Sequence, residues 1–225
     1  MKLERILIVD LETTGLDPKV DRVLEVAGIL LDVELGVPIA SASCLAKWHA
    51  NPAEGVNDIS QRLLGRLHVE WDAAHAFAPL AGLAEHAQAF AAHSAALDRS
   101  FSPTLLAGRL PWICTQFGVD WPRGKWGASL VNTALAHGVS VHASHRALDD
   151  CLLLARIMTR ARELAQRGGG LELIFRRALD RGVGVPRRCE HAGDAGQCRS
   201  WARTYSKSVV APKCVDHGGS GQWVT

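Results

Sequence analysis

The stretch "ILIVDLETTGLD", residues 6–17, begins with four consecutive apolar residues and then places two acids one residue apart. Such a run predicts a buried strand, and residues 13–15 predict where it ends. Since residues i and i+2 of a strand point to the same face, Asp10 and Glu12 project together. Two neighbouring carboxylates repel each other unless a cation lies between them, and oxygen ligands favour Mg²⁺ or Mn²⁺. An isolated D-x-E pair is also typical of a strand that simply emerges into solvent.

The overall composition indicates a globular protein. The chain has 225 residues, 48% hydrophobic and 21% charged, which suffices for one large domain or one domain with an appendage. The N-terminal segment reaches an acid after four apolar residues, and no stretch of about 18 apolar residues is free of charge. We therefore expect a cytoplasmic protein with no membrane partner. A net charge of +2 permits nucleic-acid binding without arguing for it.

Further strand-like runs follow the first one. They occupy residues 22–33 and 38–49 and are joined by a short Gly-Val-Pro turn, which predicts an antiparallel meander. From about residue 60 to 90 the sequence is Ala- and Leu-rich at helical spacing, and a short strand then runs into His93. Another short apolar segment, "LPWICT", occupies residues 110–115.

Helices are predicted between and after these strands. Ser94 is a possible N-cap for one of them. Its apolar stripe comprises Leu97, Phe101 and Leu105. Residues 127–138 predict a helix that ends at Gly138, and residues 145–170 a long helix that ends in three glycines. The core stripe of the long helix comprises Leu148, Cys151, Leu152, Ala155 and Met158. Strands first, and then strands alternating with helices, predict an α/β fold with helices on the faces of a mixed sheet.

The composition shifts after about residue 168. Residues 168–225 carry nine basic and five acidic side chains, a net charge of +4. Beyond a predicted helix at residues 171–182 they are rich in Gly, Ser, Cys and His. We therefore expect a domain at residues 1–168 and a basic, Cys- and His-containing appendage at residues 169–225.

Two more acids lie near the starts of predicted helices. Asp98 stands in "AHSAALD", just after a predicted strand end, and Asp150 in "HRALDD". A favourable interaction with the helix dipole explains either acid alone equally well. With the first pair, however, they form the ordered set D-x-E-T-T-G, A-H-S-x-x-x-D and H-x-A-x-x-D. This set resembles the three motifs of the DEDDh 3′-to-5′ exonucleases, the DnaQ-like family that includes polymerase proofreading subunits.

The resemblance covers roughly residues 5–165 and implies the ribonuclease H-like fold, a mixed five-stranded sheet flanked by helices. Within the family, the segments "PWICT", "WPRGKW", "SLVNTAL" and "HASHRALDDC" look closest to exonuclease X.

The family also implies a role for each acid. By similarity, Asp10 bridges two Mg²⁺ or Mn²⁺ ions, Glu12 and Asp150 complete the first metal site, and Asp98 supports the second. His145 is implied as the general base. These roles agree with the chemistry, because hydrolysis of an anionic phosphodiester needs cations at the attacking and leaving oxygens. An imidazole that titrates near neutrality can also accept the proton of the attacking water.

The residues after the first motif are expected to bind the substrate. Thr13, Thr14 and Leu16 are positioned to line a pocket for the 3′ end, and Gly15 lets the backbone approach the terminal nucleotide. By similarity, Leu16 wedges beside the terminal base, although an ordinary core leucine is the alternative.

Other residues near the motifs receive plainer interpretations. Asp149 falls outside the H-x-A-x-x-D spacing, so it is not expected to bind metal. We interpret His93 as a structural residue at a strand end and Cys114 as a packed thiol. Residues 57–75 depart from the family pattern and receive no role.

The predicted function is a metal-dependent 3′-to-5′ exodeoxyribonuclease that releases nucleoside 5′-monophosphates, as in DNA repair or proofreading. The same four acids and histidine would serve an exoribonuclease, since only contacts to the 2′-hydroxyl separate the two substrates. A degenerate domain that only binds nucleic acid is a third reading, which the intact acids oppose. The expected partner is nucleic acid, DNA before RNA. The sequence leaves open association with a polymerase or another DNA-processing protein.

The appendage contains a second candidate metal site. Its ligands would be Cys189, Cys198, Cys214 and His217, with His191 as a substitute. A segment without an apolar core would gain from a Zn²⁺ ion that closes its loops, and its basic residues could then hold a nucleic-acid backbone. The spacing of the first two cysteines is irregular for zinc, so reduced thiols in a loosely ordered tail are the alternative.

Overall fold

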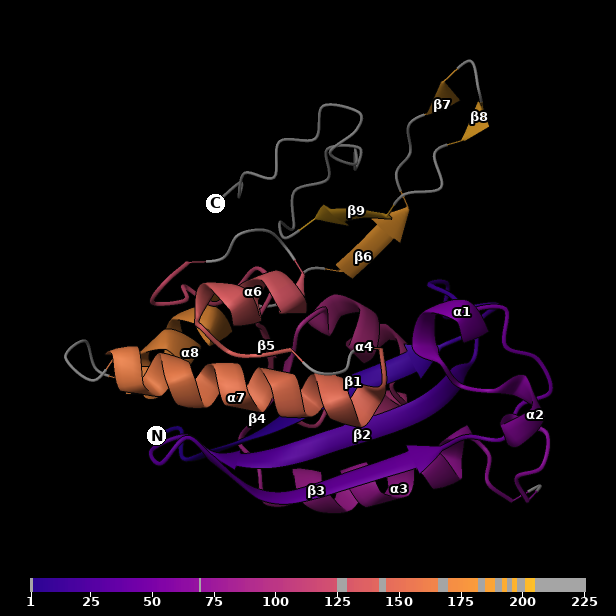
Figure 1. Ribbon diagram of the computed structural model, residues 1–225, viewed down its shortest axis with the longest axis horizontal. Coiled ribbons are helices and arrows are strands. Elements are labelled where there is room, and N and C mark those ends of the chain that lie inside the picture. The colour runs from indigo at the N-terminus through magenta and orange to yellow at the C-terminus, as the bar shows by residue number, and fades with distance from the viewer. Residues whose placement is uncertain are drawn as a thin grey trace.

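The structure is a computed structural model that describes residues 2–68, 70–124, 129–141, 145–165 and 170–181, and four short strands beyond them. Its centre is a mixed five-stranded sheet in the order β3-β2-β1-β4-β5 (Figure 1). The strands are β1 (Arg5–Thr13), β2 (Val23–Asp32), β3 (Val37–Leu45), β4 (Ala89–Ala92) and β5 (Trp112–Cys114). β1, β2 and β3 form an antiparallel meander, and β4 and β5 run parallel to β1. The predicted α/β fold with a mixed sheet is confirmed.

Helices cover both faces of this sheet. They are α1 (Glu54–Asn57), α2 (Gln61–Leu64), α3 (Ala73–Ala84), α4 (Ala95–Phe101), α5 (Thr104–Ala107), α6 (Leu130–Ala136), α7 (Ala147–Ala165) and α8 (Gly170–Arg181). The long helix α7 packs along one face, against β1 and β2, and α3 packs against β2 and β3 on the other (Figure 1). Of the described helices, none is both long and apolar enough to cross a membrane.

The short strands after α8 form two separate two-stranded sheets. β6 (Val185–Arg188) pairs with β9 (Trp201–Thr204), and β7 (Ala192–Gly193) pairs with β8 (Gly196–Gln197), both antiparallel.

The alternation of β1 decides where the acids point. Ile6 and Ile8 are buried in the core cluster under α7, whereas Leu7 is buried in the cluster under α3. The next two residues of the α7-facing row are Asp10 and Glu12, because side chains alternate between the faces. β1 therefore packs an apolar row under α7 and ends that row with two carboxylates.

The main core continues past the predicted domain boundary. Leu171, Phe175 and Ala178 of α8 are buried in the same cluster as Ile6 and the α7 side chains. The body of the molecule thus includes α8, and the division of the chain at residue 168 stays a prediction.

Two expectations about the helices need correction. The helical spacing at residues 60–90 corresponds to two helices, because α2 ends at its C-cap Gly65 and a new helix, α3, follows the N-cap Asp72. The side chain of Asp72 accepts a hydrogen bond from the backbone N–H of His75 at 2.8 Å. The apolar stripe through Leu105 is wrong. Pro103 interrupts the helix after Phe101, so Leu105 lies in α5 and is 92% exposed.

The predicted helix ends and core stripe are partly right. Ser94 occupies the N-cap position of α4, but its side chain makes no capping hydrogen bond. α6 ends just before Gly138, whose φ of 68° explains the glycine. In α7 the stripe residues Cys151, Ala155 and Met158 are fully buried. Leu148 and Leu152 are only half-buried, because the buried stripe runs instead through side chains such as Leu154 and Ile157.

Candidate active site

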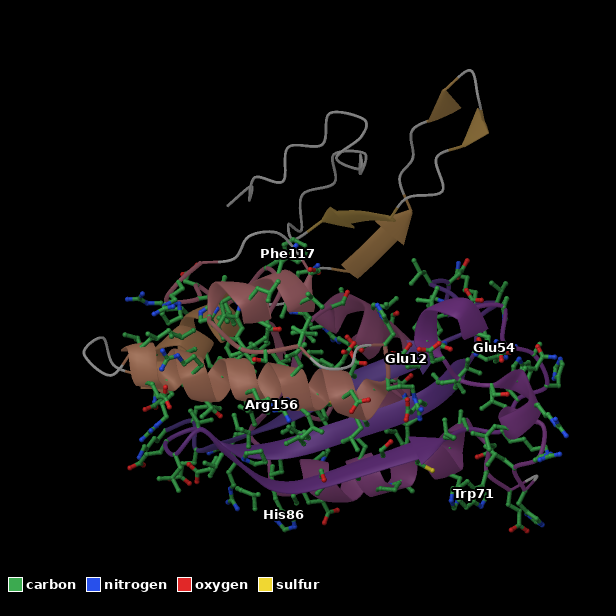
Figure 2. The ribbon with its side chains drawn as sticks, in the orientation of Figure 1. Glu12, Glu54, Trp71, His86, Phe117 and Arg156 are labelled. Atoms are coloured by element: carbon green, nitrogen blue, oxygen red, sulfur yellow. The ribbon has the colours of Figure 1, made fainter. Side chains whose placement is uncertain are left out.

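Three carboxylates meet where β1 ends beside the start of α7. Asp10 and Glu12 extend from β1 and Asp150 from the first turn of α7, and one oxygen of each lies within 4.8 Å of the others. β4 pairs only with residues 6–8 of β1, so the last part of β1 has no strand on that side. Figure 2 shows Glu12 at this end of β1, beside the N-terminal end of α7. The structure thus brings together the three acids that the resemblance assigns to the first metal site, and their binding of a metal stays a prediction.

Burial and mutual repulsion make it costly to ionise these acids together. Burial is the largest cause that raises the pKa of Asp10 well above its usual value, followed by the charges of Asp98 and Asp150. The pKa of Glu12 is raised to about 8, again mainly by burial and then by Asp150 and Glu25. Burial also raises the pKa of Asp150. Without a cation, the cluster therefore holds protons near neutral pH.

The cluster has the features of a cation site. Oδ1 of Asp150 is buried and has no hydrogen-bond partner within the described part of the chain. A buried carboxylate oxygen without a partner is rare in folded proteins and calls for an unplaced ligand or ion. Three carboxylates are hard oxygen donors that suit Mg²⁺ or Mn²⁺. Asp10, Glu12 and Asp150 therefore fit a divalent cation.

Asp98 lies close to the cluster but outside the group of three. It stands in the first turn of α4, directly after β4, and is only 4% exposed. Its negative charge is the second-largest cause of the raised pKa of Asp10. The structure thus places Asp98 where its charge acts on the cluster, and its role as a ligand of a second metal stays a prediction.

His145 precedes α7 in an unusual backbone conformation. Its φ is 65°, in the left-handed region, and its side chain is exposed. A non-glycine residue there costs about 1 to 3 kcal/mol and persists only when its surroundings hold it. Burial raises the pKa of Asp150 and the nearby backbone of His145 lowers it, so His145 lies close to this carboxyl group. His145 therefore lies beside the acids, with its imidazole open to solvent.

The loop after Glu12 is held together by Asp21. Thr14 donates its hydroxyl hydrogen to Oδ1 of Asp21 at 3.0 Å, and its hydroxyl oxygen accepts the backbone N–H of Arg22, also at 3.0 Å. A Cβ on Gly15 would lie 2.5 Å from Oδ2 of Asp21. Glycine is thus required here by a close approach within the loop itself.

The four predicted substrate-binding residues differ in what they expose. The side chain of Thr14 is buried in its loop contacts, and the hydroxyl of Thr13 donates to the carbonyl of Gly15 at 2.5 Å. Leu16 is 49% exposed, so it is not the core leucine of the alternative interpretation. That these residues bind a substrate stays a prediction.

Sequence reasoning missed an ion pair beside the cluster. Glu25 of β2 lies opposite Glu12 in the strand register and is only 3% exposed. It accepts hydrogen bonds from Nε and one terminal nitrogen of Arg146, both at 2.9 Å. The sequence feature that could have revealed this pair is the single charge within the apolar run "VLEVAGILL". A carboxylate buried in such a run requires a partner.

The remaining interpretations are mostly structural. His93 Nδ1 lies 3.1 Å from the hydroxyl of Thr115 at the strand ends, and Cys114 is fully buried with its thiol directed to the carbonyl of His93 at 3.8 Å, as expected of a packed thiol. The segment without a role now has one: Ile59 and Leu64 pack on Leu24 of β2 in a small core cluster.

The predicted zinc ligands and their substitute lie outside the described residues. They are Cys189, His191, Cys198, Cys214 and His217.

Comparisons with known proteins identify the domain. The family model described as "RNase_T: Exonuclease" matches residues 7–158. This span contains the four acids and His145. No curated protein matches the chain.

Solved structures share the fold at low identity. Exonuclease X in complex with 5′ overhanging duplex DNA is 21% identical, covers 77% of this chain and 99% of its own, and has a TM-score of 0.54. The zinc-bound complex of E. coli exonuclease I with single-stranded DNA is 16% identical over 73% of this chain, with a TM-score of 0.60, and only 42% of the exonuclease I chain is matched. Cell-death related nuclease 4 is 16% identical over 76% of this chain and 66% of its own, with a TM-score of 0.57. At such identities the likeness shows the fold alone.

Proposed function

The chain belongs to the RNase T family of exonucleases, and we propose that it degrades DNA from the 3′ end and releases nucleoside 5′-monophosphates. The observation that carries the proposal is the cluster of Asp10, Glu12 and Asp150, in which a buried oxygen has no partner among the described residues. These residues are arranged to hold a cation rather than to stabilise the fold, since burial and then mutual repulsion raise the pKa of Asp10 and Glu12.

Each acid has a proposed part in the reaction. Asp10, Glu12 and Asp150 would hold the first divalent cation, and Asp10 and Asp98 the second. Two such cations, when bound, supply Lewis acidity at the scissile phosphate. The carboxylates would orient the phosphate indirectly, through the cations that they hold.

His145 would act as the general base. Its exposed imidazole accepts one proton from a water molecule as the water oxygen bonds to phosphorus and the bond from phosphorus to the 3′ oxygen breaks. The products are a nucleoside 5′-monophosphate and a strand one nucleotide shorter, whose 3′ oxygen takes a proton from solvent. Burial raises the pKa of Asp150 and the nearby backbone of His145 lowers it, which supports a base that lies beside the acid cluster.

Two observations favour DNA and exposed 3′ ends. Exonuclease X and exonuclease I, which share the fold, were solved with DNA. The exposed Leu16 follows the acids by four residues and is available to contact a terminal base. An exoribonuclease would use the same acids, so the choice between the two sugars is left to experiment.

A nuclease assay on matched oligonucleotides tests the proposal. DNA and RNA strands of one sequence, labelled at the 5′ end, are incubated with the full chain in Mg²⁺ or in EDTA, and the products are separated by length and identified by mass. We expect a ladder that shortens from the 3′ end, mononucleotide 5′-phosphates, preference for DNA, and no cleavage in EDTA.

The control is the Asp10→Asn variant purified in parallel, which excludes a contaminating nuclease. Preference for RNA would assign the chain to the exoribonucleases. Binding of either strand with no Mg²⁺-dependent cleavage would instead make it a binding module, and the proposed function would be wrong.

A further inference from the structure

Glu25 lies near the cluster, and the structure provides its carboxylate with a full set of donors. Besides the two nitrogens of Arg146, its carboxylate accepts the backbone N–H of Ala147 at 3.1 Å and the hydroxyl of Ser43 at 3.2 Å. The carboxylate continues the α7-facing row of β2, whose apolar members include Ala27 and Ile29. Glu25 therefore joins the central sheet to the start of α7.

The residues that Glu25 holds flank the proposed base and ligand. Arg146 directly follows His145, and Ala147 is the first residue of α7, which carries Asp150 in its first turn. The first N–H groups of a helix have no acceptor within the helix itself. The Glu25 carboxylate accepts the one from Ala147, so it acts as a cap that the sheet supplies. Two consecutive residues after His145 are thus fixed to the strand that pairs with the Asp10 and Glu12 strand.

His145 needs such a restraint. Its left-handed φ of 65° is rare for a residue with a side chain and is not maintained by local preference. The fork-shaped contact of Arg146 with Glu25 uses two parallel hydrogen bonds, which fixes direction as well as distance. Arg146 also places its positive charge near Glu12, whose pKa it lowers.

We propose that Glu25 and Arg146 are positioning residues, which fix His145 and Asp150 against Asp10 and Glu12 through the sheet-to-helix ion pair. The proposal rests on the proposed nuclease function for the meaning of His145 and Asp150. It goes beyond that function because neither residue is among the proposed metal ligands, the proposed base or the proposed substrate-binding residues. Exposed ion pairs contribute little to such precision, but here one partner is buried and the contact is bidentate.

Steady-state kinetics of three variants test the pair. Arg146→Gln should lower kcat about 10-fold to 100-fold with KM changed less than about two-fold, since small misplacement of a catalytic group has effects of this size. Arg146→Lys keeps the charge but loses the fork, and should fall between Arg146→Gln and the parent. Arg160→Gln is the matched control, because Arg160 forms an exposed ion pair with Glu163 on the same helix. It should stay within about two-fold of the parent.

A double-mutant cycle separates positioning from general structural damage. In a His145→Ala background, Arg146→Gln should cost clearly less than in the parent, because one of the two groups that it positions is already absent. A further loss as large as in the parent would show that Arg146 acts independently of His145 and would overturn the positioning of the base. If Arg146→Gln does not fold, Glu25→Gln replaces it, since this change leaves no unpaired buried charge.

Amide hydrogen exchange of the metal-free protein tests the same proposal without activity. The amides of residues 145–150 should exchange at least about ten-fold faster in Arg146→Gln than in the parent, while Arg160→Gln leaves them unchanged. Unaltered exchange at these amides overturns the proposal whatever the kinetics. A parent chain without nuclease activity overturns the proposed function instead, and the exchange data then decide whether the pair holds this segment.

Discussion

Glu25 and the cluster of Asp10, Glu12 and Asp150 lie side by side on the α7 face of the sheet, but their carboxylates have opposite surroundings. Glu25 is almost fully buried and is given a bidentate arginine, a backbone N–H and a hydroxyl. Asp10, Glu12 and Asp150 are gathered within 4.8 Å of one another, and a buried oxygen of Asp150 has no partner in the described part of the chain. The chain supplies a cation to one group and leaves the other to bind one from solution.

This contrast shows which acids belong to the fold and which to function. Removing the partner of a buried, paired carboxylate destabilises the fold, whereas clustered carboxylates without a cation oppose folding through desolvation and repulsion. Those two effects are what raise the pKa of Asp10 and bring that of Glu12 to about 8. Substitutions in the two groups should therefore have opposite effects on stability and unequal effects on activity.

The largest effect is expected from Asp10→Asn. This variant keeps the shape of the side chain but removes a charge that faces the proposed cations, so cleavage should fall at least about 10³-fold, because metal-ion catalysis contributes several kcal/mol. Single-turnover cleavage of a 5′-labelled DNA strand measures the loss. A cleavage rate of Asp10→Asn near that of the parent would contradict the assignment of the clustered acids to function.

The next effect concerns His145. Both His145→Ala and His145→Asn should lower kcat by about 10² to 10⁴ with substrate binding little changed, since each removes the proposed base. Asparagine tolerates the left-handed backbone better than alanine does, so His145→Asn should also unfold at a higher temperature than His145→Ala. A rise in KM with unchanged kcat would contradict the assignment of the base.

A smaller effect is expected on the pH dependence of stability. The pKa of Glu12 is raised in the folded state to about 8, so the metal-free fold binds more protons than the unfolded chain. Stability should therefore be highest below the unfolded pKa of about 4.5 and fall as pH rises toward about 8. Asp10 and Asp150, whose pKa values are also raised, act in the same direction.

The Glu12→Gln variant isolates this contribution. In EDTA at about pH 8 it should unfold several degrees above the parent, since about 1 kcal/mol moves the midpoint of a domain of this size by about 2 to 4 °C. Mg²⁺ should remove the difference by stabilising the parent alone. Thermal unfolding curves at several pH values, recorded with both proteins, provide the test, and parallel curves in EDTA would contradict the prediction.

The smallest effect is expected from Ser43→Ala. The hydroxyl of Ser43 is one of four donors to Glu25 and the longest of them at 3.2 Å. Its loss should cost about 0.5 to 1.5 kcal/mol of unfolding free energy, measured by urea denaturation, because the other donors keep the carboxylate satisfied. A loss of unfolding free energy above about 3 kcal/mol would contradict this prediction, because it would mean that the remaining donors do not keep the Glu25 carboxylate satisfied.

The sequence predicted the cluster better than the pair that supports it. Asp10 and Glu12 share a face by the period of the strand, and the spacing of the three motifs led to Asp150 and His145. The contact of Glu25 with Arg146 joins residues 121 positions apart, so no local pattern contains it. The left-handed backbone of His145 is likewise set by tertiary contacts.

The error about Leu105 has a local cause, whereas the missing role of the segment around Ile59 has a distant one. Leu105 fitted a helical period, but Pro103 ends the helical hydrogen bonding before that residue is reached. The role of the segment around Ile59 depends on packing against Leu24 of a distant strand, which periodicity alone does not reveal. The hydroxyl of Thr14 is engaged by Asp21 and Arg22 within its own loop, and its expected role in substrate binding stays a prediction.

The most direct test of the central claim is a calorimetric titration of Mn²⁺ into chelator-treated protein. The three clustered carboxylates should bind the ion and release protons near neutral pH, because their raised pKa values mean that metal replaces bound protons. Asp150→Asn should abolish this binding, while Arg160→Gln should leave it intact. Absence of binding in the parent, or equal binding in Asp150→Asn, would contradict the account.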